Sequence, residues 1–341
     1  MTAAEPAAAP ESARRPPATI YDIARELGVS ASTVSRALHK PGRVSAQTAE
    51  RIRATADALG YRINPMARAL PTGRSGTLAL VLSDITNPVY FDLVRGAERV
   101  ATAVGSSLVL AESQESASAE LEAARRLQVA ADGLMLVSSR LDDDDVRTLA
   151  AGKPLVLVNR VVDGVPGLVP DVGPGIRAAL EHLHELGHRS LVYLSGPASS
   201  WMSRTRWELL LDEAVRRGIS IVEIGPGSPT MAGGEESLRR VLASGATAVL
   251  AFNDLMAIGL LQACRAEGIP VPGRLSVIGF DDIFGSALTT PSITTVRSPL
   301  GELGAAAVRR LSAAIDGDEA GEHAVLATEL VVRESTARAA G

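Results

Sequence analysis

Residues 19–43, TIYDIARELGVSASTVSRALHKPGR, predict two short helices joined by a tight turn. Thr19 is a suitable N-cap, and Asp22 follows at the third helical position, where its carboxylate faces free backbone N–H groups. Gly28 can take the left-handed conformation that ends a helix. One apolar face of the first helix is formed by residues at helical spacing: Ile20, Ile23, Ala24 and Leu27.

The second helix is expected to be capped by Ser30 or Ser32 and to turn Val34, Ala37 and Leu38 inward. Hydroxyl groups bond phosphate oxygens, and an arginine can bond the edge of guanine through two hydrogen bonds. The outward face therefore favours a helix that lies against DNA, and the alternative is a helix hairpin inside an all-α core. The residues on this face are Ala31, Ser32, Thr33, Ser35, Arg36 and His39.

Positive charge is concentrated at this end of the chain. Residues 14–74 hold eleven Lys or Arg and four Asp or Glu, a surplus of seven positive charges, whereas the formal net charge of all 341 residues is −5. A basic segment on an acidic body indicates nucleic-acid binding at one end only. Residues 1–17 are rich in Ala, Pro and Glu without a continuous apolar run, so we expect a disordered tail and not a signal peptide.

A third helix is expected to follow, with Ser45 as its cap and Gly60 at its end. Three helices within about 45 residues make a minimal hydrophobic core. Residues 18–63 are therefore predicted to form a small all-α domain. The inner face of its third helix is Ala49, Ile52, Ala56 and Leu59.

Residues 64–74 mark a boundary. Asn64 and Pro65 can start a short helix, whereas Pro71 cannot continue it because proline lacks an N–H group. So short a helix is unstable alone in water, since its nucleation is costly. The segment is either a hinge that folds when something binds it or a plain flexible linker.

From residue 75 to the end, short apolar runs alternate with amphipathic helices. The predicted strands are 77–82, 107–111, 133–138, 155–158, 190–194, 220–224, 247–252 and 275–280. The predicted helices are 89–104, 116–129, 142–150, 174–186, 203–217, 233–244, 254–267 and 299–316. Continuous Val and Leu runs between helices predict parallel sheets covered on both faces, and two polar, Gly/Pro-rich breaks suggest two α/β subdomains.

Polar side chains follow many of these strands, at the edge where open α/β sheets bind ligands. Acids, amides and arginines around a cleft suit a polyhydroxylated ligand, because they offer paired acceptors and donors. The alternative is that these residues cap the helices after the strands. They are Ser83, Asp84, Ser138, Ser139, Asn159, Arg160, Asn253, Asp254, Asp281 and Asp282, with Arg204 and Arg206 at a helix start.

The sequence gives little support to an enzymatic function. No Gly-x-Gly-x-x-Gly follows a strand, which argues against a dinucleotide-dependent enzyme. The single Cys264 allows no internal disulfide, fits a reducing cytoplasm and is expected in the core. His182 and His184 face different sides of a helix that ends before His188, so no metal site is expected. We expect no enzyme, no metal and no cofactor.

An export-dependent sugar receptor is a second alternative. It would need an export signal, and it would have no use for residues 19–70. No stretch approaches the roughly 18 apolar residues of a membrane span. We therefore expect a cytoplasmic, nucleoid-associated protein without a membrane partner.

The motifs together resemble the lactose/galactose-repressor (LacI/GalR) family, from residue 18 to about 338. At the N-terminal end they are VSASTVSRAL at 29–38, residues 44–61 and 64–70, and TGR at 72–74. In the body they include Asp84 with NPVYF at 87–91, Asn159-Arg160, LGHR at 186–189, Gly196-Pro197 with Arg204 and Arg206, FND at 252–254, residues 277–282, and LTTPSITTV at 288–296.

The resemblance implies a transcription factor, usually a repressor, whose operator affinity is controlled by a small molecule. Its core would be a periplasmic-binding-protein-like pair of Rossmann-like lobes. Lobe one would comprise about 75–172 and 297–325, and lobe two about 173–296 and 326–338. A homodimer is expected on a pseudo-palindromic, double-stranded operator. Whether the chain represses or activates stays open.

The resemblance also assigns DNA contacts. Ala31, Ser32 and Arg36 would meet base edges, and Leu70 would wedge into the minor groove and kink the duplex. Because Ala31 and Ser32 are small, specificity would depend more on Arg36 and on DNA shape. Pro71 stands where a basic or small residue is more usual. The other implied DNA-binding residues are Thr19, Tyr21, Ser30, Thr33, Ser35, His39, Asn64, Ala67 and Arg68.

The effector is implied to lie between the lobes. Family effectors are usually sugars and sometimes nucleosides or purines, and Arg206 with Asp281 and Asn253 favours recognition of hydroxyl groups. The implied effector-binding residues are Asp84, Tyr90, Phe91, Ser138, Asn159, Arg206, Asn253 and Asp281.

Overall fold

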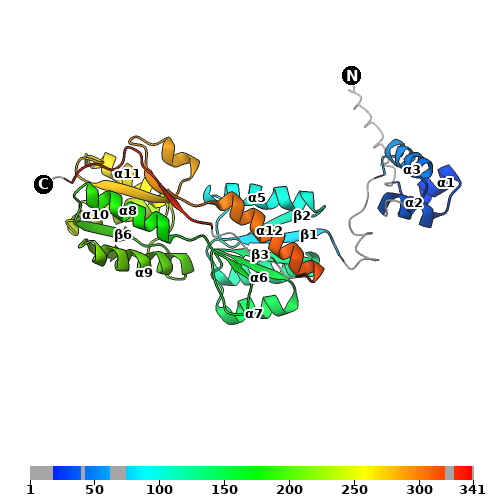
Figure 1. Ribbon diagram of the computed structural model, residues 1–341, viewed down its shortest axis with the longest axis horizontal. Coiled ribbons are helices and arrows are strands. Elements are labelled where there is room, and N and C mark those ends of the chain that lie inside the picture. The colour runs from blue at the N-terminus through cyan, green and yellow to red at the C-terminus, as the bar shows by residue number, and fades with distance from the viewer. Residues whose placement is uncertain (1–17, 40–42, 62–73, 319–325, 340–341) are drawn as a thin grey trace, which may run out of the picture. The chain divides into compact units, whose positions relative to one another are not determined.

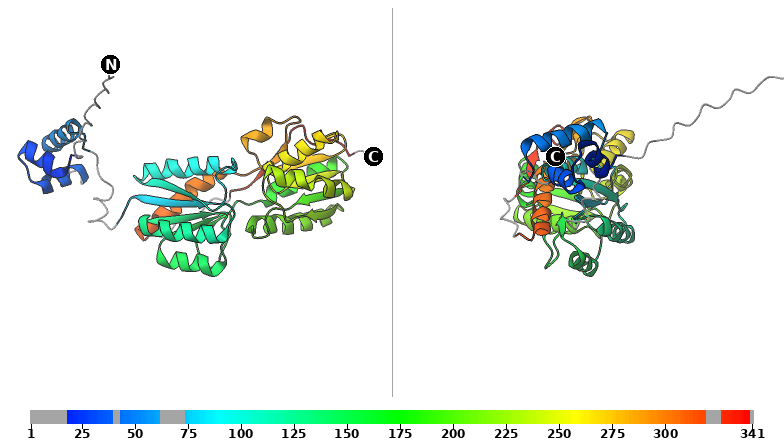
Figure 2. Two further views of the ribbon diagram at one scale, coloured as in Figure 1. Left: turned by 180° about the vertical axis from the view of Figure 1, so that it is seen from behind. Right: turned by 90° about the vertical axis from the view of Figure 1, so that its right-hand side faces the viewer.

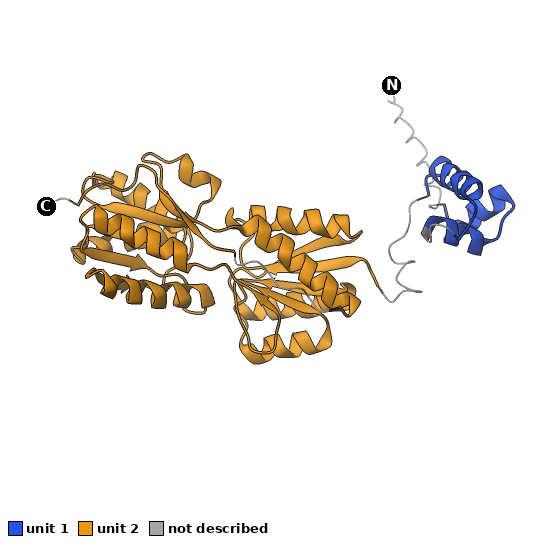
Figure 3. Cartoon of the chain, viewed as in Figure 1, with its two compact units in different colours: residues 1–73 blue, residues 74–341 orange. Residues whose placement is uncertain are grey.

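The computed structural model describes residues 18–39, 43–61, 74–318 and 326–339. The chain divides into two compact units, residues 1–73 and residues 74–341 (Figure 3). Among the described helices, none is both long and apolar enough to cross a membrane.

The first unit consists of three helices, α1 (Ile20–Leu27), α2 (Ala31–His39) and α3 (Ala46–Ala58). The backbone N and the hydroxyl of Thr19 both donate to Asp22 Oδ2, at 2.8 and 2.7 Å, and Gly28 ends α1 in the left-handed conformation with φ 65°. Ser30 Oγ accepts the N–H of Thr33 at 3.2 Å, so Ser30 caps α2. The centre of the core holds Ile23, Val34 and Ile52, which are fully buried.

The second unit contains two α/β lobes (Figure 1). The first lobe has a five-stranded parallel sheet in the order β2-β1-β3-β4-β5. Its strands are β1 (Thr77–Leu82), β2 (Ser107–Glu112), β3 (Gly133–Val137), β4 (Leu155–Val158) and β5 (Gly167–Leu168). One face packs on α5 (Val89–Ala103) and α12 (Leu300–Asp316), and the other on α6 (Ala117–Ala130) and α7 (Asp143–Gly152).

The second lobe has a six-stranded sheet in the order β11-β10-β9-β8-β6-β7, in which only β10 and β11 are antiparallel. Its strands are β6 (Ser190–Leu194), β7 (Ser220–Ile224), β8 (Ala248–Ala251), β9 (Ser276–Asp281), β10 (Thr294–Arg297) and β11 (Glu329–Val331). The covering helices are α8 (Gly173–Glu185) and α9 (Trp201–Arg216) on one face, and α10 (Met231–Ala243) and α11 (Asp254–Ala266) on the other; η1 (Phe284–Ala287) is a short 3-10 turn.

The predicted fold class is confirmed. All eight strands and eight helices predicted between residues 77 and 316 are present, with ends within two residues of the prediction. The prediction missed β5, β10 and β11, of two to four residues each, because no long apolar run marks them. Since β10 and β11 both belong to the second sheet while α12 packs on the first, the chain passes between the lobes before and after α12.

Helices α5 and α12 lie side by side on the first lobe, as Figures 1 and 2 both show. Gly96 and Gly301 permit the close approach of the two helices. A Cβ at Gly96 would lie 1.9 Å from the carbonyl oxygen of Gly301, whereas a Cβ at Gly301 would meet nothing nearer than Asp92 O at 3.6 Å. The contact therefore requires glycine at position 96 but not at position 301, and Gly304 of α12 is restricted in the same way, since a Cβ there would lie 2.0 Å from Leu93 O.

Gly96→Ala is expected to lower the free energy of unfolding of the core by about 1–3 kcal/mol, because the added methyl group pushes the helices apart. Gly301→Ala is the matched control and should be neutral or slightly stabilising, since alanine favours helix. Urea unfolding followed by circular dichroism measures both. Equal destabilisation by the two variants would contradict the close contact at Gly96.

Candidate nucleic-acid face and ligand cleft

Helix α2 carries the predicted DNA-facing residues. Val34 and Ala37 are buried against α1 and α3, which leaves Ser32 and Arg36 exposed on the opposite side. Arg36 forms no hydrogen bond or ion pair with any other described residue, so its guanidinium is available to a ligand. Ala31, Thr33 and Ser35 are partly buried on the flanks of this face.

The hydroxyl groups at the start of α2 are partly engaged with one another. Besides its cap bond, Ser30 Oγ lies 2.8 Å from both Ser32 Oγ and Thr33 Oγ1. Thr19 and Tyr21 are exposed at the start of α1. His39 is in the last turn of α2, and its side chain lies outside the described residues, as do Asn64, Ala67, Arg68, Leu70 and Pro71 of the predicted hinge.

In the second lobe, α9 and β9 bring Arg206 and Asp281 together. The Arg206 guanidinium carbon lies 3.5 Å from the centroid of the Phe280 ring and 5.0 Å from that of Phe252. Nη2 donates to Asp281 Oδ1 at 3.4 Å, and Nη1 donates to the carbonyl oxygen of Phe252. The guanidinium thus contacts two aromatic rings, and its Nε is buried without a partner among the described residues.

Asp281 is poised between its charged and neutral forms. Burial raises its pKa, and the neighbouring Arg206, at the long distance of 3.4 Å, offsets this rise only in part. The resulting pKa is about 7. The backbone of Asp281 has φ 106°, a conformation that L side chains rarely adopt. Strained backbone at the end of a strand, beside a perturbed carboxyl group, is typical of binding sites.

Asn253 has structural contacts. Its Oδ1 accepts the N–H of Met256 at 2.9 Å and caps α11, and its Nδ2 donates to the carbonyl oxygen of Pro229 at 2.8 Å. These bonds match the capping alternative raised by the sequence. One Nδ2 hydrogen remains for a ligand.

In the first lobe, Ser138 and Asn159 follow β3 and β4 and contact each other. Asn159 Nδ2 donates to Ser138 Oγ at 3.3 Å, and Asn159 Oδ1 is buried without a partner among the described residues. Tyr90 OH lies 2.7 Å from Ser83 Oγ. Asp84 instead organises its own loop, because its Oδ1 accepts the N–H and hydroxyl of Thr86 at 2.8 and 2.6 Å.

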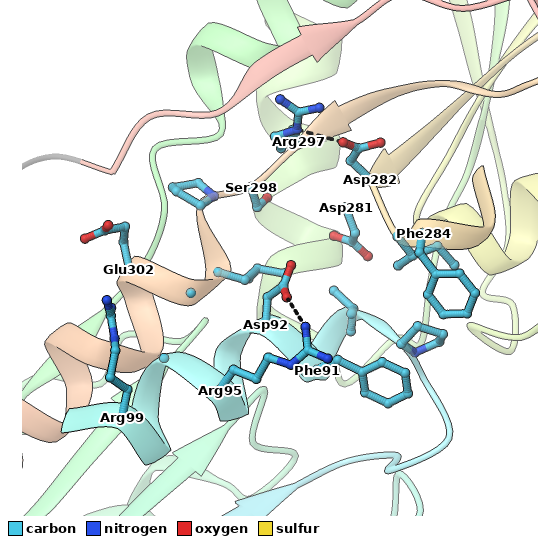
Figure 4. A pocket seen from close by; sticks show the side chains of 17 residues that line it. Phe91, Asp92, Arg95, Arg99, Asp281, Asp282, Phe284, Arg297, Ser298 and Glu302 are labelled. Carbon is cyan, nitrogen blue, oxygen red and sulfur yellow. Dashed lines mark hydrogen bonds and ion pairs between the residues drawn. The ribbon is translucent and has the colours of Figure 1, made fainter. Parts of the chain in front are cut away.

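A pocket of about 900 Å³ lies between the two lobes (Figure 4). Of the predicted effector residues, only Phe91 and Asp281 belong to its lining. Phe91 on α5 and Phe284 on η1 stack across the lobes, with ring centroids 6.5 Å apart and planes at 13°. The lining residues that the sequence did not indicate include Phe284, Arg297, Ser298, Arg95, Arg99 and Glu302.

Ser298 illustrates why these residues were missed. Its Oγ is buried without a partner among the described residues, and it directly follows β10. The rule that ligand groups follow strands would have found Ser298 if residues 294–297 had been identified as a strand. The residues of α5 have no such signal, because only the packing of α5 on α12 places them along the pocket.

Two of the other histidines have structural partners, and Cys264 is buried. His182 Nε2 lies 2.9 Å from Thr336 Oγ1, and His188 Nδ1 lies 2.8 Å from Thr247 Oγ1. Burial raises the pKa of the Cys264 thiol to about 11, so this group stays protonated at neutral pH. Within the described ranges, no group of three or more His, Cys, Asp or Glu could hold a metal ion.

Comparison with known proteins agrees with this division. Residues 19–64 match the family model described as bacterial regulatory proteins, lacI family, and residues 180–336 match that of periplasmic binding protein-like domains. The HTH-type transcriptional regulator DegA of Bacillus subtilis (strain 168) is 32% identical over 336 residues, which cover 93% of this chain and 98% of DegA.

Two solved structures are similar to this protein over most of its length. The lac repressor dimer bound to its operator and the anti-inducer ONPF has a TM-score of 0.84 at 29% identity, covering 94% of this chain and 100% of that one. The complex of the transcriptional regulator CelR with cellobiose has a TM-score of 0.67 at 29% identity, with the same coverage.

Asp281→Asn is expected to change how stability depends on pH. The folded protein keeps a proton on Asp281 up to about pH 7, whereas the unfolded chain releases it near the ordinary pKa of 3.8. Unfolding therefore releases a proton between these values, and the stability of the wild type relative to Asp281→Asn falls as pH rises from about 4 to about 7. The slope is at most about 1.4 kcal/mol per pH unit. Urea unfolding at several pH values measures it, and parallel curves for the two proteins would contradict the raised pKa.

Proposed function

Since this chain belongs to the LacI family of bacterial regulatory proteins, we propose that it is a homodimeric repressor released from its operator by a sugar bound between the core lobes. It is a DNA-binding transcriptional regulator controlled by a small molecule, like its relatives. We place it in the cytoplasm, at the nucleoid, where its operator would lie.

The observation that carries the proposal is the unused hydrogen-bonding capacity at the facing ends of the two lobes. Buried polar atoms are nearly always bonded, so a buried donor or acceptor without a protein partner marks a place for water, an ion or a ligand. Arg206 Nε in lobe two and Asn159 Oδ1 in lobe one are such atoms. Asp281 adds an acceptor oxygen beside Arg206. These groups support an effector held by both lobes.

A sugar fits these groups, because its hydroxyls both donate and accept. The CelR structure contains a disaccharide, cellobiose, in a fold of this kind. A nucleoside is the second candidate, supported by the nearly parallel rings of Phe91 and Phe284, which offer a flat apolar surface to a base. The same site would serve either ligand.

We propose that the effector changes the DNA affinity by moving the lobes. A ligand that bonds to both lobes favours one lobe arrangement, and this arrangement shifts the dimer contacts of the first lobe and separates the hinge segments. Such coupling is typically worth about 1–3 kcal/mol. The opposite sign, in which the ligand strengthens DNA binding, is an outcome that operator titration with and without effector would reveal.

Arg36→Ala is expected to weaken operator binding by about 1–3 kcal/mol and to relax the preference at one base pair, because it removes a side chain that reads a base edge. The operator is first selected from random DNA with the wild type. Arg53→Ala, an exposed arginine on α3, is the matched control for loss of one charge. Equal binding of wild type and Arg36→Ala to the selected operator would contradict the assignment.

Arg206→Ala is expected to abolish effector binding and to leave operator binding within about twofold, because the site and the DNA face are separate. A thermal-shift screen of sugars and nucleosides identifies the effector, since a ligand of the native state raises its stability. Arg216→Ala, at the other end of the same helix and exposed, is the control that should keep effector binding. Loss of both functions in Arg206→Ala would indicate misfolding and would remove the support for a two-site model.

A further inference from the structure

Three buried guanidinium groups near the ends of the strands each have a carboxylate partner among the described residues. Arg206 pairs with Asp281 at 3.4 Å. In the first lobe, Arg140 Nε lies 2.6 Å from Glu115 Oε2, and Arg160 Nη2 lies 2.6 Å from an oxygen of Asp143. All three guanidinium groups are at least nine-tenths buried. None of these three arginines therefore carries an unpaired positive charge.

The charged residues on the side of the cleft where the chain passes between the lobes are also paired. Asp282 accepts from Arg297 Nε at 2.7 Å and from Arg333 Nη2 at 2.6 Å, and Arg297 also pairs with Glu329 at 2.9 Å. The lining of the large pocket contains three arginines and four acidic residues. The two arginines without a buried acid, Arg95 and Arg99, extend from α5 at the outer part of the pocket, where Asp92 and Glu302 also lie (Figure 4).

Lysine cannot supply the missing charge. The sequence contains two lysines, Lys40 and Lys153. Lys153 precedes β4, at the end of the first sheet opposite to the cleft, and its Nζ donates to the carbonyl oxygen of Ala131. Lys40 belongs to the first unit. A phosphate group bound beside Arg206 would thus meet a paired arginine and unpaired acceptors, and the exposed Arg95 and Arg99 lie only at the α5 side of the pocket.

The unpartnered groups favour a ligand that donates hydrogen bonds. Asp281 has a carboxylate oxygen beyond the one facing Arg206, and Asn159 Oδ1 and Ser298 Oγ are buried without a partner among the described residues and can accept, whereas Arg206 Nε can only donate. Sugar hydroxyls can donate to both acceptors and accept from Arg206. A phosphate ester brings negative charge beside a buried carboxylate, which costs free energy.

We infer that the effector is an uncharged, unphosphorylated sugar, and that paired acidic residues exclude sugar phosphates from the cleft. This inference rests on the proposed effector site, and it specifies the charge of the ligand there. Asp281 has two roles in it: it accepts a hydroxyl of the sugar, and in its ionised form, which dominates above neutral pH, its charge offsets that of Arg206.

Inorganic phosphate is the direct probe. We expect the Tm of the full-length wild-type protein at pH 8 to be the same in 20 mM phosphate as in chloride of equal ionic strength. Asp281→Asn frees Arg206, and its Tm should rise by about 2–4 °C in phosphate through mass action. Adding Arg206→Gln to this variant should remove the rise. Phosphate bound at the DNA-binding unit is common to all three proteins and cancels in the comparison.

Glu115→Gln provides an independent variant, because it frees Arg140 in the other lobe and should also create a phosphate-dependent rise. Stabilisation of the wild type by phosphate that Arg206→Gln abolishes would overturn the inference. Absence of any rise in both Asp281→Asn and Glu115→Gln would also overturn it, because the acids would then not be what excludes anions.

A paired screen separates this inference from the proposed function. Glucose, fructose and trehalose are each tested beside glucose 6-phosphate, fructose 1-phosphate and trehalose 6-phosphate, for Tm and for release of operator DNA. A phosphate ester that binds as well as its parent sugar, or better, contradicts the inference and leaves ligand-controlled DNA binding intact. If a nucleoside is the sole effector, the inference that the ligand is a sugar is wrong, whereas the inference that the ligand is uncharged stands. A parent sugar preferred at least tenfold supports both.

Discussion

The side chain of Asp254 determines the shape of the cleft wall in the second lobe. It is fully buried at the start of α11, and burial raises its pKa to about 6. Its oxygens accept from Ser286 Oγ and Thr295 Oγ1, both at 2.6 Å, and from the N–H of Ile283 at 2.9 Å. One carboxylate thus joins a helix, a strand and the loop after β9. Gly279 leaves the space for it, since a Cβ there would lie 2.0 Å from Asp254 Oδ1.

This anchoring explains how the neighbouring site tolerates strain. Asp281 and Asp282 adopt φ values of 106° and 56°, which are costly for residues with a side chain. The bonds of Asp254 hold the loop after them, and Arg297 and Arg333 hold Asp282 itself. Asp281 faces the pocket and its neighbour binds the segments that join the lobes. A ligand that contacts Asp281 therefore acts one residue away from the ion pair that holds the end of β10, where the chain leaves the second lobe.

Much of this architecture could be predicted from the sequence, because local pattern controls it. The long apolar strands, their helices and the cap at Ser45 follow from spacing and residue type. The rest depends on contacts between distant segments: β10 and β11 are short, and they are strands because they pair with each other and with β9. The site shows the same division. Asp281 was found as a strand-end residue and Arg206 at a helix start. Ser298 was missed because β10 was missed, and Phe284, Arg95 and Arg99 reach the pocket through packing. The sequence left open whether Asn253 caps a helix or binds a ligand, and only the structure shows that its side chain caps α11 and bonds to Pro229.

The position of α12 has a consequence for how the chain is made. The apolar face of the first sheet and of α5 is covered by a helix that begins only at Leu300, and the second sheet is completed only by β11 at Glu329–Val331. During synthesis from the N-terminus, both lobes remain unfinished until almost the whole chain has left the ribosome. Exposed apolar surface on unfinished lobes invites aggregation, so this topology places the greatest demand on chaperones late in translation. It also means that neither lobe can be expressed from one continuous segment of the gene.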